Sequence, residues 1–271
     1  MGLFGIGCGS SLRRSEFEDV DMPYQDARSM LKVRLYPESM LQGHVDEAPV
    51  VARHLAPGLL AVVARDLPET VEAVPREQAA VWGIHDDELF RMGYANVADQ
   101  DQPQVQTRRL DPGFELTTLS GESFFTTTNA LWPDRYLQVF SATGALVGVP
   151  HRHSVLVHPI RDFSALYAIN LMLVSLDRMY RQGPGSLSPM LYWWRPGSFT
   201  LLPGDVVDGQ VRFSPPSEFV QVLNRLANRP PGPGPAQPRP AGPPPGYRGT
   251  RPAAMPGPPR RQPGEATYGR F

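Results

Sequence analysis

The chain has 271 residues, of which 41% are hydrophobic and 20% are charged, so it is long enough to bury a core in one or two domains. This composition excludes a collagen, a coiled coil, a disulfide scaffold and a wholly disordered chain. The formal net charge is −1, but residues 229–271 carry seven Arg and one Glu, whereas residues 1–228 carry 19 basic and 26 acidic side chains. The acidic body argues against specific nucleic-acid binding, which needs clustered positive charge.

Composition divides the chain into three regions. Residues 1–25 combine a Gly/Ser patch with an acidic stretch and are predicted to be a mobile N-terminal arm. Residues 26–228 carry the periodic hydrophobic pattern of a folded domain. Residues 229–271 contain 14 prolines and eight glycines, so we expect a disordered tail with polyproline II character. This tail is either a solubilising tether or a segment that docks as polyproline II on an aromatic groove, with its arginines adding weak attraction to acidic surfaces.

Cysteine usage and hydrophobic runs bear on cellular location. Cys8 is the only cysteine, so a disulfide within the chain is excluded, in agreement with a reducing compartment. The apolar start lacks the basic region of a signal peptide, and the most apolar internal run, residues 163–176, is too short to span a bilayer. We therefore expect a cytoplasmic protein with no transmembrane segment.

The first half of the body alternates between predicted strands and helices. Residues 31–36 alternate apolar and polar side chains, as in a half-buried strand, and residues 59–64 have the continuous apolar pattern of a central strand. Residues 70–74 fit a strand that pairs beside it. A short helix follows Pro75 and extends to about Trp82. The acids at 86–88 suit the start of a second helix, whose apolar residues end at Val97.

The second half begins with three predicted strands, over residues 105–110, 114–119 and 122–125, and a short helix that ends near Pro133. Residues 145–149 and 154–158 fit a hairpin, as do 189–194 and 198–202. The longest predicted helix covers 162–181, with one buried face formed by Phe163, Leu166, Ile169, Leu173, Leu176 and Tyr180. A last helix covers 216–227. These elements predict one α+β domain with a mixed, largely antiparallel sheet packed on helices.

Four segments, within about residues 31–202, carry a family resemblance. They are Leu60–Pro68; Trp82-Gly83-Ile84 with Glu88-Leu89 and Ala95-Asn96-Val97; Gly148-Val149-Pro150 with Val155–Val157; and Leu187-Ser188-Pro189 with Leu191-Tyr192. In their order and spacing these segments resemble the YtpQ family, a bacterial domain of unknown function. The resemblance implies an α+β fold without an assigned reaction, and it supplies no active-site residues.

Standard catalytic and cofactor motifs are missing from the sequence. A P-loop needs Gly-Lys-Ser/Thr, and the single lysine, Lys32, lies in another context. The glycines near the start lack dinucleotide-binding spacing, and Gly121 to Phe125 lacks the second glycine of a nucleophile elbow. We therefore expect no cofactor.

The best local cluster of metal-ligating residue types is His151, His153 and His158. On an extended chain, His151 and His153 share a face and both reach one metal ion, whereas His158 has the opposite parity. Zinc needs further ligands from elsewhere in the chain. The alternative interpretation is a polar loop whose histidines bond to backbone or water.

Two further groups are candidates for chemistry or binding. Asp66, Glu69 and Glu72 lie near a predicted strand end and, together with the acids at 86–88, suit a divalent cation or acid–base catalysis; alternatively they are solvated charges. Trp193, Trp194 and Arg195 suit an exposed binding surface, because aromatic residues and arginine concentrate binding energy; alternatively they pack in the sheet.

The missing motifs, the acidic body and the family resemblance together favour a non-enzymatic module that binds another protein in a regulatory or neutralising role. The competing hypothesis is a hydrolase or metal-dependent enzyme that uses His151 and His153 or the carboxylates of Asp66 and Glu69.

Overall fold

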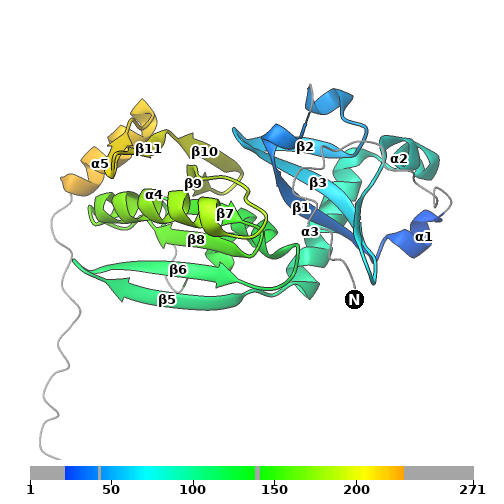
Figure 1. The fold of residues 1–271 in the computed structure, drawn as a ribbon, viewed down its shortest axis with the longest axis horizontal. Coiled ribbons are helices and arrows are strands. Elements are labelled where there is room, and N and C mark those ends of the chain that lie inside the picture. Colours follow the sequence, from blue (N-terminus) through cyan, green and yellow to red (C-terminus); the bar gives the residue numbers. More distant parts are fainter. Residues whose placement is uncertain (1–21, 42–43, 138–140, 229–271) are drawn as a thin grey trace, which may run out of the picture. The chain divides into compact units, whose positions relative to one another are not determined.

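The structure is a computed structural model, and it describes residues 22–41, 44–137 and 141–228 (Figure 1). The tail, Cys8 and most of the N-terminal arm lie outside these residues, so the predictions about them stay predictions. Helices and largely antiparallel sheets make up the described part, which confirms the α+β class. None of its helices combines the length and the apolar character needed to cross a membrane.

A four-stranded antiparallel sheet forms the first half of the body. Its strands are β1 (Leu31–Pro37), β2 (Ala52–Ala56), β3 (Leu59–Asp66) and β4 (Val71–Ala73). Strand β3 is central: β1 pairs along one edge, and β2 and β4 pair along the other. The structure therefore confirms the central place expected for residues 59–64, whereas β2 lacked a recognisable pattern in the sequence.

The second half contains a six-stranded and a two-stranded sheet. The larger sheet has the order β10-β9-β7-β8-β6-β5, with β5 (Gln104–Leu110), β6 (Phe114–Ser120), β7 (Ala145–His151), β8 (Ser154–Pro159), β9 (Leu191–Arg195) and β10 (Ser198–Leu202). Both expected hairpins, β7–β8 and β9–β10, are present. Strands β11 (Gly204–Val207) and β12 (Gln210–Phe213) form a separate hairpin. The strands thus divide among three sheets instead of one.

Five α-helices complete the described fold: α1 (Tyr24–Ala27), α2 (Arg76–Trp82), α3 (Asp86–Gln100), α4 (Ala165–Gln182) and α5 (Ser217–Ala227). Short 3-10 helices are η1 (Glu38–Met40), η2 (Val45–Glu47), η3 (Thr126–Leu131) and η4 (Pro133–Arg135). Helix α3 begins at its three acids, as predicted, and continues past Val97.

Residues 122–125 form a loop instead of the expected strand. Ser123 Oγ accepts a hydrogen bond from Phe125 N at 3.1 Å, and Thr126 Oγ1 donates to Ser123 O at 2.8 Å. Such local bonds from Ser and Thr side chains satisfy backbone groups without a partner strand. The prediction of a strand was wrong because the apolar pair Phe124-Phe125 suggested sheet packing.

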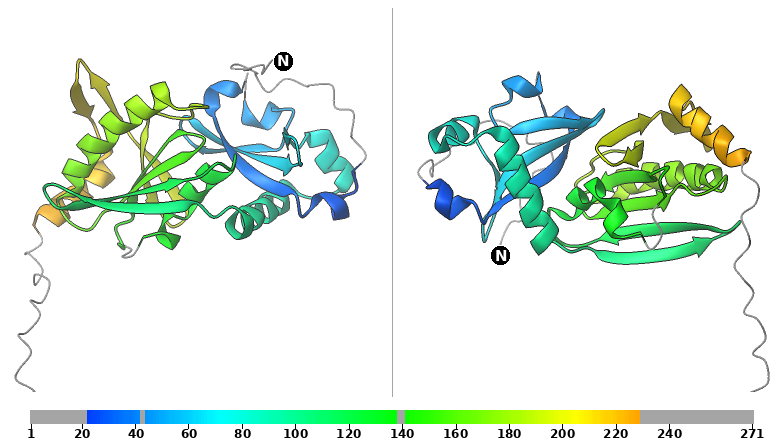
Figure 2. Two further views of the ribbon diagram at one scale, coloured as in Figure 1. Left: turned by 60° about the horizontal axis from the view of Figure 1, so that its bottom comes forward. Right: turned by 180° about the vertical axis from the view of Figure 1, so that it is seen from behind.

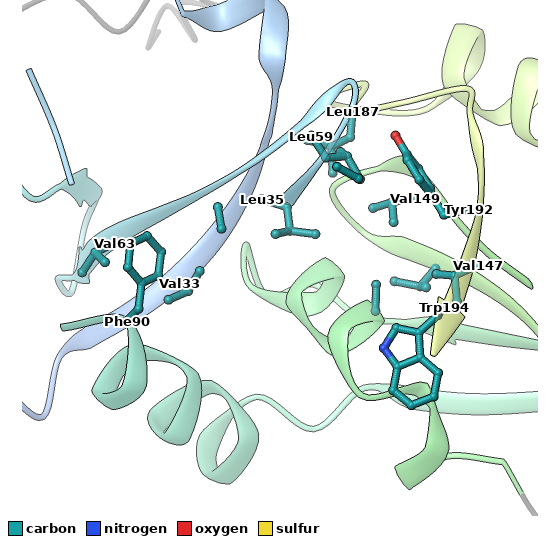
Figure 3. Packing of buried hydrophobic residues seen from close by; sticks show 14 of the residues in the cluster. Val33, Leu35, Leu59, Val63, Phe90, Val147, Val149, Leu187, Tyr192 and Trp194 are labelled. Carbon is teal, nitrogen blue, oxygen red and sulfur yellow. The ribbon is translucent and has the colours of Figure 1, made fainter. Parts of the chain in front are cut away.

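The central strands of the six-stranded sheet, β7, β8 and β9, are buried on both faces, whereas β5 is exposed. One face shares a core with β1 and β3, in which Val147, Val149 and Tyr192 lie with Leu35 and Leu59 (Figure 3). The opposite face packs against α4, which runs along the sheet, and against α5 (Figure 2). This second core contains Leu146, Leu191 and Trp193 from the strands, together with Ile169, Leu173, Leu176 and Phe219 from the helices.

Side chains satisfy the outer edge of β1. Asn96 Nδ2 donates to Leu31 O at 2.7 Å, and Thr128 Oγ1 donates to Val33 O at 2.7 Å. These bonds replace the backbone partners that another strand would supply, because exposed carbonyls on a sheet edge are otherwise left unpaired. They attach helix α3 and η3 to the four-stranded sheet.

Gly148 allows the closest approach between β7 and α4, and this predicts a stability effect. An added Cβ would lie 2.3 Å from Leu176 Cδ2, so Gly148→Ala overpacks the core and lowers the free energy of unfolding by about 1–3 kcal/mol. Urea denaturation measures this change. Combining it with Leu176→Ala makes room for the new methyl group, so the double variant loses less stability than the sum of the single variants. Additive losses would contradict the contact.

Candidate functional site

The two tryptophans expected on a binding surface are buried in β9. Trp193 is 2% exposed and Trp194 is 6% exposed, because both faces of the sheet are covered. Trp193 Nε1 donates to Thr143 O at 2.8 Å, and Trp194 Nε1 donates to Leu131 O at 2.9 Å. The expectation of an exposed aromatic surface is therefore corrected: these rings hold the sheet between its two cores.

Arg195 lies at the edge of a pocket of about 420 Å³. Its guanidinium carbon is 3.9 Å from the ring centroid of Trp193, and Nη1 pairs with Glu218 Oε1 at 2.5 Å. Val222 and Arg225 of α5 also line the pocket. Two of the three predicted binding residues thus meet here, in a pocket with an apolar wall and an Arg195–Glu218 ion pair that leaves Arg195 Nε without a hydrogen-bond partner in the described residues.

The structure places His151 and His153 on either side of a hairpin turn. His151 ends β7 and pairs with Ser154, so the chain is not extended through residues 151–153. His153 Nδ1 lies 2.8 Å from Gly121 O, and Arg152 Nε donates to His153 Nε2 at 2.9 Å. Both ring nitrogens of His153 therefore have protein partners. The metal site proposed for these histidines stays a prediction that this geometry does not support.

His158 is buried on the α4 side of β8. Its Nδ1 lies 2.6 Å from Glu115 O, and its Nε2 is buried without a hydrogen-bond partner in the described part of the chain. Burial lowers the pKa of His158, and the charge of Arg161 lowers it further, against the effect of the Glu115 carbonyl. The imidazole is therefore held neutral in the core.

The predicted carboxylate cluster is divided among separate ion pairs. Arg65 Nη2 lies 2.8 Å from Glu72, and Arg76 Nη1 lies 3.0 Å from Asp86, while Glu69 is exposed. Across residues 22–41, 44–137 and 141–228, no three His, Cys, Asp or Glu side chains converge as a metal site would require. The alternative interpretation, solvated charges, fits the exposed Glu69, whereas Glu72 and Asp86 have arginine partners.

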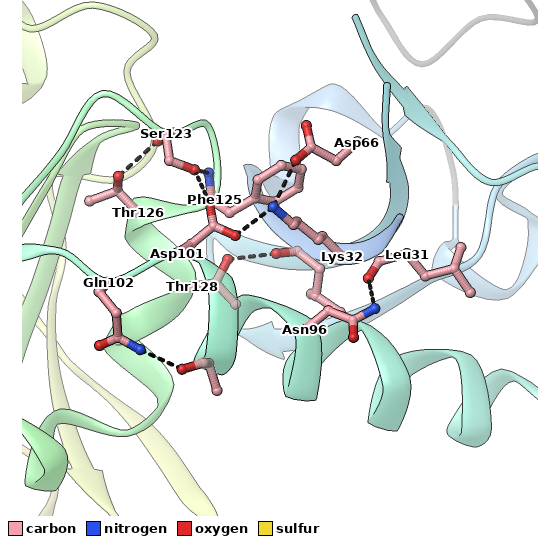
Figure 4. A network of polar contacts seen from close by, with 12 residues as sticks. Leu31, Lys32, Asp66, Asn96, Asp101, Gln102, Ser123, Phe125, Thr126 and Thr128 are labelled. Atoms are coloured by element: carbon pink, nitrogen blue, oxygen red, sulfur yellow. Dashed lines mark hydrogen bonds and ion pairs between the residues drawn. The ribbon is translucent and has the colours of Figure 1, made fainter. Parts of the chain in front are cut away.

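Asp66 belongs to a network centred on Lys32 (Figure 4). The Lys32 ammonium lies 2.7 Å from Asp66 Oδ2 and 2.7 Å from Asp101 Oδ2, and it lies 5.0 Å from the Phe125 ring centroid. Ser123 Oγ donates to Asp101 Oδ1. Burial lowers the pKa of Lys32, but its bonds to the two carboxylates outweigh burial, so the pKa lies above its usual value of 10.5. The only lysine of the chain thus stays charged and joins β1, β3, α3 and the 121–125 loop.

Large apolar side chains are exposed along the outer face of α4, and one of them, Phe163, was expected in the core. Phe163, Tyr167, Leu171 and Val174 are 45%, 54%, 38% and 45% exposed. The spacing of Tyr167, Leu171 and Val174 places them on one side of the helix, opposite the buried Ile169, Met172 and Leu176, and Phe163 precedes the helix. We call these four residues the α4 outer stripe.

Phe163 was expected on the buried face, and the structure corrects this. Helix α4 begins at Ala165 rather than at Asp162, so Phe163 lies in the preceding turn. The signal that could have revealed the stripe is the predominantly apolar run 163–176, in which the apolar residues cover more of the helix than one buried face requires.

Removal of the Lys32 charge is predicted to destabilise the fold. Lys32→Met leaves two carboxylates facing each other, which costs about 3–5 kcal/mol in the free energy of unfolding. Asp101→Asn costs more than Asp66→Asn, because the Asp101 side chain is 9% exposed and that of Asp66 is 36% exposed. Since the folded-state pKa of Lys32 is raised, its contribution is complete below pH 10.5 and is lost as the pH rises above it. Urea denaturation across this range measures both effects, and a neutral Lys32→Met substitution would contradict them.

The stability of the protein is predicted to decrease in acid because two histidines have lowered pKa values. Burial lowers the pKa of His158, and burial with the charges of His153 and Arg152 lowers that of His151. Their contribution is therefore complete above the usual histidine value of 6.5 and is lost as the pH falls through their folded-state pKa values. Denaturation at a series of pH values should show a smaller slope below pH 6.5 for His158→Gln. The exposed His44→Gln is the control, and equal slopes in both variants would contradict the assignment.

Comparisons of the chain with protein-family models, with curated proteins and with solved structures found no match in any of the three. The resemblance to the YtpQ family therefore stays a prediction. The function has to be inferred from the residues of this chain.

Proposed function

We propose that the chain is a non-enzymatic, cytoplasmic bacterial module that binds another protein through the α4 outer stripe. Membership of the YtpQ family is part of this proposal. The observation that carries it is the set of four large apolar side chains, each at least 38% exposed, of which three lie on the side of α4 opposite the core and Phe163 lies in the turn before it. Single exposed apolar residues are ordinary on protein surfaces, but a continuous patch marks an interaction site.

The size of the stripe indicates the kind of partner. Four half-exposed side chains present roughly 300 Å² of apolar surface. A stable homodimer buries about 800 Å² on each partner, which is more than twice this area. An amphipathic helix that packs its own apolar face along α4 needs a smaller contact area. Its apolar contact residues recur at the same helical spacing as those of the stripe. We therefore take the occupant to be a helix of a partner protein.

The charge at one end of the stripe adds to the chemistry of the partner. Arg178 is exposed one turn beyond Val174, and its Nε contacts the neutral Gln182 side chain at 3.3 Å. A carboxylate on the partner helix would pair with this guanidinium. The expected partner thus combines an apolar helical stripe with an acidic side chain at the end that meets Arg178.

The competing hypothesis of a hydrolase or metal-dependent enzyme gains no specific observation. His153 has protein partners at both ring nitrogens, and Asp66 is held by Lys32. The enzyme hypothesis therefore rests on the sequence pattern alone.

The test combines site-specific crosslinking with variants of the full chain. A photoreactive amino acid at position 171 should crosslink one protein in native lysate, whereas the same group at Val81, an isolated residue that is 74% exposed, should not. With the purified partner, Leu171→Glu and Tyr167→Glu should weaken binding at least tenfold, because each places a charge in the apolar contact. Val81→Glu is the matched control.

Two results would contradict the proposal. Equal crosslinking from positions 171 and 81 would show that the stripe has no selectivity. Crosslinking only to a second copy, together with a dimer mass in light scattering, would show that the stripe serves self-association instead.

A further inference from the structure

We propose that Arg34, Arg152 and Phe124 form a binding site for a phosphate group, either free or as a phosphate ester of a small molecule. The three residues come from different parts of the chain. Arg34 lies in β1, Phe124 lies in the 121–125 loop, and Arg152 lies in the turn between β7 and β8. The site is separate from the α4 outer stripe and does not depend on the proposed protein partner.

The two guanidinium groups converge on one exposed ring. The guanidinium carbon of Arg34 is 5.0 Å from the ring centroid of Phe124, and that of Arg152 is 5.2 Å from it. Arg34 is also 4.7 Å from the ring of Tyr36. Phe124 is 40% exposed, so the ring that both guanidinium groups approach is accessible from solvent.

These two cations lack a counter-charge within the described residues. Seven other arginines pair there with a carboxylate: Arg53, Arg65, Arg76, Arg91, Arg161, Arg181 and Arg195. Arg34 and Arg152 take part in none of these pairs, and Arg34 Nε is buried without a hydrogen-bond partner there. Burial lowers the pKa of Arg34, and the neighbouring charge of Arg152 lowers it further.

The neighbouring Lys32 shows how the charge of a cationic side chain on β1 is neutralised in this protein. Lys32 and Arg34 lie two residues apart on the same side of β1. Lys32 lies near Phe125, and Arg34 lies near Phe124. Two carboxylates neutralise Lys32, whereas Arg34 faces a second cation. Two like charges beside each other are unfavourable until an anion binds between them.

Arg152 is held in place before any ligand arrives. Its Nε donates to His153 Nε2 at 2.9 Å, and His153 Nδ1 lies 2.8 Å from Gly121 O. The side-chain stem packs against Gly185, where an added Cβ would lie 2.9 Å from Arg152 Cδ. These contacts engage Nε and the stem but not the terminal nitrogens, which suits a preorganised anion site.

The chemistry of two arginines favours phosphate over other anions. Each guanidinium offers a planar fork of donors that matches two oxygens of a tetrahedral phosphate. A phosphate monoester carries up to two negative charges, so it neutralises both cations, whereas a carboxylate neutralises one. Nucleic acid is disfavoured because residues 1–228 carry 26 acidic against 19 basic side chains.

The first experiment measures melting of the full chain in inorganic phosphate, in phenyl phosphate and in sodium chloride of matched ionic strength. Phosphate at ten times its Kd should raise the Tm by about 3 °C over chloride. Arg152→Gln should abolish this rise, and Arg109→Gln, an exposed arginine in β5, should keep it. A rise with phenyl phosphate alone assigns the site to an ester, and a rise with inorganic phosphate assigns it to the free ion.

The second experiment separates binding from folding. Without phosphate, Arg34→Gln should melt no lower than the native chain, because it removes an uncompensated charge. Nitrogen-15 spectra should show phosphate-dependent shifts of the Nε–H signals of Arg34 and Arg152 but not of Arg109. Equal phosphate effects on the native chain and Arg152→Gln would overturn the proposal. Binding of RNA or a phosphopeptide without any response to phenyl phosphate would also overturn it.

Discussion

Burial of the central strands β7, β8 and β9 of the six-stranded sheet on both faces is the constraint on which the other features depend. In β9, Tyr192 and Trp194 point into the core shared with the four-stranded sheet, while Trp193 points into the core under α4 and α5. Burial of each large aromatic side chain contributes about 2–3 kcal/mol relative to exposure. These rings therefore stabilise the fold, and any surface for a partner has to come from the outer helix or from loops at the sheet edges.

The outer edge of β1 shows how one stabilising device positions another feature. Asn96 and Thr128 satisfy the edge carbonyls, and Lys32 joins the strand to Asp101. Asp101 in turn accepts from Ser123, so the 121–125 loop is fixed at its centre. The next residue, Phe124, is then presented beside Arg34. The buried Lys32 network and the Arg34 site are thus held by the same strand and loop. Carboxylates neutralise the charge of Lys32, whereas none in the described residues pairs with Arg34.

Sequence patterns predicted those elements whose environment is local. The continuous apolar run over 59–64 has one structural solution, a strand covered on both faces, and the acids at 86–88 begin α3 as the helix dipole requires. The loop at 122–125 was mistaken for a strand, because hydrogen bonds from Ser123 and Thr126 outweighed the apolar pair. The separate β11–β12 hairpin was not predicted, although Asp208-Gly209, with φ angles of 50° and 75°, is a local signal for its turn.

The candidate sites were harder to predict, because exposure and pairing depend on distant segments. Nothing local distinguishes Arg34, which lacks a carboxylate partner in the described residues, from Arg65, which pairs with Glu72 across the neighbouring strand. Likewise, the sequence of β9 resembles a binding motif, and only the complete fold shows that both faces of this strand are covered. Long-range packing decides such cases, whereas periodicity reports only which residues share a face.

The apolar residues of α4 lie on two faces. Folding requires those on the inner face but not those on the outer face. Six residues of the helix, among them Ile169, Met172 and Leu176, fill the core under the sheet. The side chains of the α4 outer stripe are only about half buried in the described fold, and exposed apolar area promotes association. A polar residue at each of these positions would keep the helix and remove that liability. The combination of a filled core with an exposed apolar outer face therefore supports the proposal that another molecule contacts α4.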